Sequence, residues 1–196
     1  MGCFLSKTKP KAKAKNRLNI VVCSNSGEDS VQGLIRHITE NMSDVVGSAS
    51  VKFAPLPFNV ADMKTFEFRG IDALLLCHSM DIKGPFRSGY GFSSIYHKFL
   101  YKAKRCLGKK KVAVIVHDYK LGLSLEALET YSKTNKSTFN MTSLVLTLGQ
   151  LAAWGGSTQL TDVQLDEFKS FFEGALSCRR IIVGAFYRFF YRLIRQ

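Results

Sequence analysis

The stretch LNIVVCSNSG, residues 18–27, decides how the rest of the chain is interpreted. A short, β-branched apolar run that stops at small polar residues is typical of a buried strand leading into a turn. Between residues 31 and 38, apolar side chains then recur at spacings of three and four, which indicates an amphipathic helix. Residues 18 to about 42 are therefore predicted to form a β-α unit.

The same alternation continues along the chain. Near-continuous apolar runs predict three more buried strands, over IDALLLC (71–77), KVAVIV (111–116) and SLVLTL (143–148). Residues 51–58 carry Pro55 and Pro57, which confines this segment to a sheet edge. Helices are expected over 94–107 and 124–131, and from the capping box at Thr161 to Phe172.

Buried strands that alternate with helices indicate a parallel sheet covered on both faces. We therefore expect residues 18–177 to form one α/β domain, with a three-layer, doubly wound and mostly parallel sheet of about five strands. A basic tail over 1–17 and a basic helix over 178–196 are expected to flank it.

The order and spacing of these elements resemble the flavodoxin-like fold. The turn at Ser24–Ser30 is similar to the hydroxyl-rich phosphate loop of flavodoxins, and NVAD (59–62), followed by Phe66 and residues 71–76, looks like the stretch before their third strand. The resemblance implies a ligand site and makes FMN a candidate cofactor. It places that ligand against Ser24, Asn25, Ser26, Gly27 and Tyr119. An ordinary capped turn remains the alternative.

Ligands of open parallel sheets bind at the carboxyl ends of the strands. There, Cys77, His117 and Asp118 contain the groups needed for a thiol nucleophile, an imidazole base and an orienting carboxylate. No complete catalytic motif accompanies them, so their alternative role is packing. The five cysteines are scattered without metal-ligand spacing, and neither a metal site nor a disulfide framework is expected.

Charge is concentrated at the two ends of the chain. The formal net charge is +13, but residues 18–177 carry 17 basic and 15 acidic side chains. A nucleic-acid-binding domain usually carries a basic stripe on its folded body. The distribution therefore favours an anionic membrane over nucleic acid as the partner.

The N-terminus combines three membrane signals. Gly2 and Ser6 fit the pattern for N-myristoylation, and Cys3 is a neighbouring site for palmitoylation. A polybasic run follows, consisting of Lys7, Lys9, Lys11, Lys13, Lys15 and Arg17. One myristoyl chain binds a bilayer only marginally, so a second acyl chain or a basic run is needed for stable residence.

The C-terminal segment 178–196 predicts an amphipathic helix. Its polar face carries Arg188, Arg192 and Arg195, whereas Phe186 and Phe190 lie on the opposite face. This pattern is typical of a helix that lies in a membrane interface, and a last helix packed on the sheet is the alternative.

These features predict a lipid-anchored peripheral membrane protein on the cytosolic face of the plasma membrane or of endomembranes. Its body is expected to serve as a signalling, scaffold or ligand-binding module. Anionic lipids and a protein are the expected partners, and nucleic acid is not. The alternative function is a membrane-attached enzyme, either an FMN-dependent oxidoreductase or a Cys/His hydrolase. No secretory signal and no apolar stretch of membrane-spanning length is recognised in the sequence.

Overall fold

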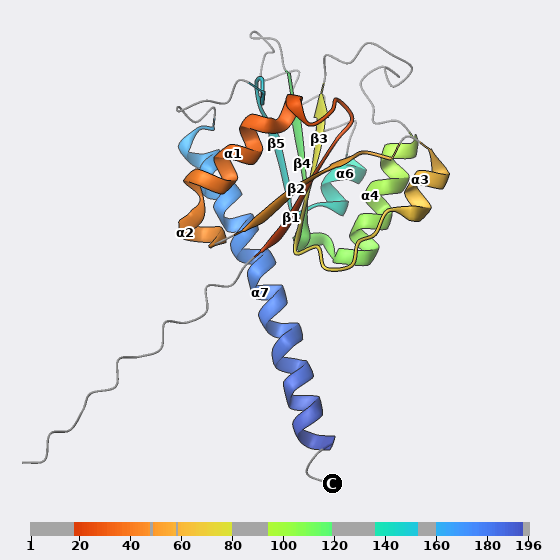
Figure 1. The fold of residues 1–196 in the computed structure, drawn as a ribbon, viewed down its shortest axis with the longest axis vertical. Coiled ribbons are helices and arrows are strands. Elements are labelled where there is room, and N and C mark those ends of the chain that lie inside the picture. Colours follow the sequence, from red (N-terminus) through yellow and green to blue (C-terminus); the bar gives the residue numbers. More distant parts are fainter. Residues whose placement is uncertain are drawn as a thin grey trace, which may run out of the picture.

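The computed structural model describes residues 18–47, 49–57, 59–79, 94–118, 136–152 and 160–193, with side chains of the last segment described as far as Ser177. Its centre is one sheet of five strands (Figure 1). The strands are β1 (Asn19–Ser24), β2 (Ser50–Pro55), β3 (Ala73–Ser79), β4 (Val112–His117) and β5 (Leu144–Thr147).

All neighbouring strands are parallel, in the order β2-β1-β3-β4-β5. The order reverses direction at β1, which lies between β2 and β3, and this is the strand order of flavodoxin-like proteins. The predicted doubly wound α/β fold is therefore confirmed. β2 lies at the sheet edge, as Pro55 and Pro57 indicated, with Pro55 as its last residue.

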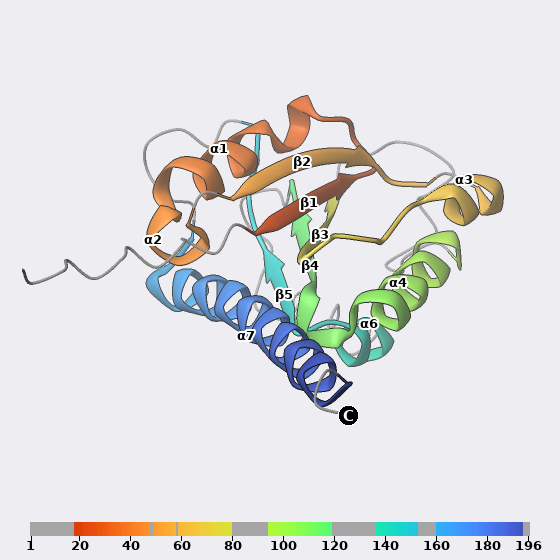
Figure 2. The same cartoon turned by 60° about the horizontal axis from the view of Figure 1, so that its bottom comes forward.

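Helices cover both faces of the sheet (Figures 1 and 2). One face carries α1 (Gln32–Asn41), α2 (Ser43–Val46) and α7 (Asp162–Leu193), and the other carries α3 (Val60–Thr65), α4 (Ser94–Leu107) and α6 (Lys136–Met141). Two short 3₁₀ helices, η1 (Asp29–Val31) and η2 (Lys109–Lys111), precede α1 and β4. The expected helix over 124–131 lies outside the described residues.

Two hydrophobic cores explain why the strands are almost continuously apolar. Successive side chains of a strand point to opposite faces of the sheet. In β3, Leu75 and Cys77 belong to the core under α1 and α7, whereas Leu74 and Leu76 belong to the core under α3 and α4. In β3 and β4 nearly every residue is thus buried on one side or the other, and no polar alternation is left in their sequences. The edge strand β2 is only half-buried or exposed.

The last helix differs from the prediction. The capping box is confirmed, because the Gln164 amide donates to Thr161 Oγ1 at 3.3 Å and the Thr161 amide donates to Gln164 Oε1 at 3.1 Å. The expected end at Phe172 is wrong, since α7 runs on to Leu193 without a break. No proline interrupts these residues, and the predicted helix over 178–196 is the continuation of α7 rather than a separate element.

α7 has two parts with different surroundings. Phe168, Phe172 and Ala175 are fully buried in the core of the α1 face. The C-terminal part of the helix leaves the body and projects past it (Figure 1). At about 1.5 Å per residue, the segment from Ser177 to Leu193 is about 25 Å long. Among the described helices, none combines the length and the apolar character needed to cross a bilayer.

The packing of α7 predicts a sharp contrast between two positions on the same helix. Phe172→Ala removes a fully buried ring and is expected to lower the free energy of unfolding by about 3–5 kcal/mol. Val163→Ala, at a side chain that is 69% exposed, is expected to change it by less than about 0.5 kcal/mol. Urea unfolding of the full chain measures both, and equal effects would contradict this packing of α7.

Candidate functional site

Polar side chains from β1, β3 and β4 meet where the strands end. We call this side of the sheet the carboxyl edge, and the opposite side, where the strands begin, the amino edge. Asn25, just after β1, links the ends of β1 and β3 through its side-chain amide group. Its Oδ1 accepts from the Ser79 amide at 3.2 Å, and its Nδ2 lies 3.4 Å from His78 Nδ1. Because an amide nitrogen only donates, His78 Nδ1 accepts and the proton of the neutral ring is on Nε2.

Asp118 joins the ends of β3 and β4. The Ser79 hydroxyl donates to Asp118 Oδ2, and His117 Nδ1 lies 3.0 Å from the same carboxylate oxygen. The Asp118 backbone has φ of 62°, in the left-handed region, and its amide donates to the Gly149 carbonyl at 3.1 Å. This conformation costs a residue with a side chain roughly 1–2 kcal/mol, although Asp adopts it more readily than most.

The two imidazoles are held in the neutral form. Burial lowers the pKa of His78 to about 4, with a smaller contribution from neighbouring His117. Burial also lowers the pKa of His117, and the Asp118 carboxylate opposes that shift only in part. His117 is fully buried, and among the described residues neither ring nitrogen has a hydrogen bond of regular geometry, although Nδ1 is in close contact with Asp118 Oδ2. The site therefore presents one carboxylate that is 23% exposed, beside the buried ring of His117 and the half-buried ring of His78, both neutral.

The predicted trio of Cys77, His117 and Asp118 is only partly assembled. His117 and Asp118 are adjacent, but the Cys77 side chain lies fully buried in the core under α1 and α7. Burial raises the pKa of the Cys77 thiol well above its ordinary value, and the nearby Cys23 adds to the shift. A thiol with a raised pKa forms little of the thiolate that acts as nucleophile. The structure therefore does not support a nucleophilic role for Cys77.

The order of the remaining groups also differs from that of a hydrolase triad. In such a triad the imidazole lies between the nucleophile and the carboxylate. Here the Asp118 carboxylate lies between the Ser79 hydroxyl and the His117 ring. Ser79, which was not among the residues predicted for this site, is therefore a central member of the cluster. Its position directly at the end of a buried strand was the available signal.

The hydroxyls of the first loop bond to one another. Ser30 donates to the Gly27 carbonyl at 2.7 Å, so Ser26 must donate to Ser30 across 2.6 Å and Ser24 to Ser26 across 2.9 Å. Each hydroxyl has a single proton, and all three are used within the loop. Gly27 has φ of +87°, which permits the turn that brings these side chains together.

This loop does not fit the phosphate group of FMN. No serine proton in it is free for an anion, and the exposed carboxylates of Glu28 and Asp29 follow directly. An anion would have to break the hydroxyl chain and approach two negative charges. The predicted ligand contact at Tyr119 lies outside the described residues.

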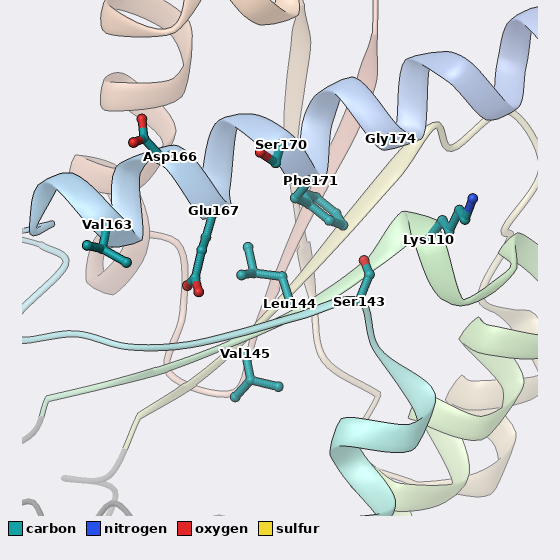
Figure 3. A pocket seen from close by; sticks show the side chains of 10 residues that line it. All are labelled: Lys110, Ser143, Leu144, Val145, Val163, Asp166, Glu167, Ser170, Phe171 and Gly174. Carbon is teal, nitrogen blue, oxygen red and sulfur yellow. The ribbon is translucent and has the colours of Figure 1, made fainter.

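Two grooves lie away from this edge. One, of about 670 Å³, runs between β5 and α7, with Glu167 toward one end and Lys110 toward the other (Figure 3). A second, of about 420 Å³, lies beside β1 and β2 and includes Phe66 and Arg69. No residue of the Asn25–Asp118 cluster lines either groove. In the part of the chain with described side chains, no three His, Cys, Asp or Glu residues are grouped so that they could hold a metal ion.

Comparison with known proteins adds little to this geometry. No family model matches the chain, and no curated protein matches it either. Among solved structures, the homoserine dehydrogenase of S. aureus is similar over 67% of this chain, with 13% identity and a TM-score of 0.30. This chain spans 31% of that protein. The class of protein is therefore defined by strand order and layers alone: a five-stranded, doubly wound α/β protein of the flavodoxin-like type.

The positions of the cysteines predict their reactivity. In a chain carrying Cys3→Ser and Cys178→Ser, iodoacetamide is expected to modify the exposed Cys106 at least about tenfold faster than Cys77, because burial disfavours the Cys77 thiolate. Peptide mass spectrometry over time measures both rates, and unfolding in urea should bring them together. Faster labelling of Cys77 in the folded chain would restore it as a candidate nucleophile.

Proposed function

We propose that this protein is a lipid-anchored peripheral membrane protein on the cytosolic face of a membrane, and that its flavodoxin-like body is a signalling, scaffold or ligand-binding module. One observation carries the proposal. The two ends of the chain that bear membrane signals leave the body at the same edge of the sheet, and the polar cluster around Asp118 lies at the opposite edge.

The direction of the strands supports this arrangement. Leu18 precedes β1, so the tail with Gly2, Cys3 and the lysine run joins the body at the amino edge. α7 starts near the carboxyl edge, where Gln164 Nε2 donates to the Thr147 carbonyl at 3.3 Å, and runs antiparallel to the strands. Its C-terminal part leaves the body, again at the amino edge (Figure 1).

Attachment through both ends suits the physical limits of each anchor. A myristoyl chain at Gly2 supplies an association constant of only about 10⁴ M⁻¹, and a second acyl chain at Cys3 adds about 0.8 kcal/mol per buried methylene. Basic residues near an anionic leaflet add about 1 kcal/mol each. The projecting part of α7 offers a further contact with the membrane. Its helical periodicity places Arg188 and Arg192 on one face and Phe186 and Phe190 on the opposite face.

A binding role is favoured over a hydrolase role for the body. The buried Cys77 leaves the Cys/His mechanism without its nucleophile, and the bonded serine loop does not fit an FMN phosphate. The cluster of Asn25, Ser79 and Asp118 still offers a partly exposed carboxylate at the carboxyl edge, where ligands of this fold class bind. We therefore place the ligand or protein partner there.

The anchoring proposal predicts the effect of two substitutions in cells. Gly2→Ala should move most of the protein from the membrane to the cytosolic fraction, because no acyl chain can be attached. Cys3→Ser should weaken retention while leaving acylation at Gly2 intact. Fractionation and immunoblotting of cells expressing each variant measure this. Full membrane retention of the Gly2→Ala protein would refute acylation as the anchor.

A further inference from the structure

The amino edge of the sheet gathers basic side chains from two separate parts of the chain. The basic cluster, as we call it, lies at the starts of β3 and β4, and consists of Arg69, Lys104, Arg105, Lys109, Lys110 and Lys111. Lys104 and Arg105 are in the last turn of α4, and η2 supplies the three successive lysines just before β4. All six side chains are exposed or half-buried.

Hydrogen bonds and packing fix this cluster beside both points where the chain leaves the body. Asn19 Nδ2 donates to the Gly70 carbonyl at 3.1 Å, which holds the loop with Arg69 against the start of β1. At the other side, Lys110, Phe171 and Gly174 line one groove, so η2 adjoins α7 just before the helix projects (Figure 3). The cluster therefore lies beside both exits.

The positive charge of the cluster is not neutralised locally. Among the described residues, none of its six side chains has a carboxylate within ion-pair distance. The acids at this edge are Glu67, next to Arg69, the buried Asp72, which accepts from the Asn19 amide, and Glu173, beside Gly174 on α7. Glu40 and Asp44 lie on the α1–α2 side of the same edge. At the opposite edge, the exposed side chains of Glu28, Asp29 and Asp162 are acidic. The nearly neutral body thus carries its charges unevenly along the strand direction.

We propose that the basic cluster is a docking surface for anionic membrane lipids, which holds the body with its amino edge toward the bilayer. This inference rests on the proposed function for its location at a membrane. The cluster adjoins both anchored ends, so lysine and arginine side chains are brought within reach of lipid headgroups. Because α7 projects beyond the amino edge, a bilayer that contacts both the basic cluster and the projecting helix must lie at an oblique angle to the helix axis.

Tyr101 supports a lipid surface as the occupant. Its side chain is 57% exposed and lies one turn of α4 before Lys104 and Arg105. A tyrosine ring has an apolar body and a polar tip, which suits the headgroup region of a bilayer. The attraction of a lysine for an anionic leaflet decreases within a Debye length of about 10 Å at 0.1 M salt, so only side chains close to the headgroups contribute to it.

The test compares two triple variants of the full chain that remove the same charge. Both carry Gly2→Ala, so that acylation does not mask the electrostatic contribution. The edge variant combines Lys109→Gln, Lys110→Gln and Lys111→Gln. The control variant combines Arg36→Gln, Lys64→Gln and Lys98→Gln, at exposed positions outside the cluster. Cosedimentation with phosphatidylserine-containing vesicles in 0.05 M salt measures the affinity, and thermal unfolding checks that both variants fold.

The edge variant is expected to bind at least about tenfold more weakly than the parent, and the control variant less than about threefold, because only the edge lysines lie near the headgroups. Equal losses, or no binding by the parent, would overturn the docking surface. So would an edge variant that keeps its vesicle affinity but loses affinity for duplex RNA or DNA, which would assign the cluster to nucleic acid. The cell fractionation of Gly2→Ala tests the anchoring proposal separately, so either can fail alone.

Discussion

Parallel pairing of all five strands is the constraint on which the rest of the structure depends. Parallel strands give a sheet two chemically different edges, because every carboxyl end lies at one edge and every amino end at the other. A chain that enters on a strand and finishes on an antiparallel helix then has both ends at the amino edge. The carboxyl edge is left for polar side chains, and here it holds Asn25, Ser79 and Asp118.

The two edges also differ in how their polar groups are used. At the carboxyl edge, Asp118 in a left-handed conformation draws Ser79 and His117 together, and burial keeps the imidazoles neutral. Unfavourable backbone conformations of this kind persist where the surrounding structure holds them, and they gather at functional sites. At the amino edge, the lysines of η2 are exposed or half-buried and have no carboxylate within ion-pair distance among the described residues. The polar groups of the carboxyl edge thus make short-range hydrogen bonds, whereas the lysines of the amino edge can act through longer-range electrostatic attraction.

The strands were predictable because burial on both faces removes polar alternation, and residues 71–77 needed only a shift of two residues to become Ala73–Ser79. The end of α7 was not predictable. The apolar spacing that places Phe168 and Phe172 in the core does not continue past the point where the helix leaves the core, so the pattern predicts two separate helices. The burial of Cys77 was not predictable either, because it depends on what covers the sheet. The basic cluster was not predicted because Arg69 and the lysines of η2 lie far apart in the sequence, and the pairing of β3 with β4 brings them to the same end of the sheet. The acidic side chains of the body also offset them in its net charge.

The most direct test of the account is the orientation of the body on a membrane. The N-myristoylated chain with Cys3→Ser and Cys178→Ser is labelled with a fluorophore at Cys106, in the last turn of α4, or, with Cys106→Ser, at Glu28→Cys beyond β1. Energy transfer to an acceptor on lipid headgroups then reports the distance of each edge from the bilayer. Docking of the amino edge on the bilayer predicts clearly stronger transfer from position 106 than from position 28. Equal transfer, or stronger transfer from position 28, would contradict it.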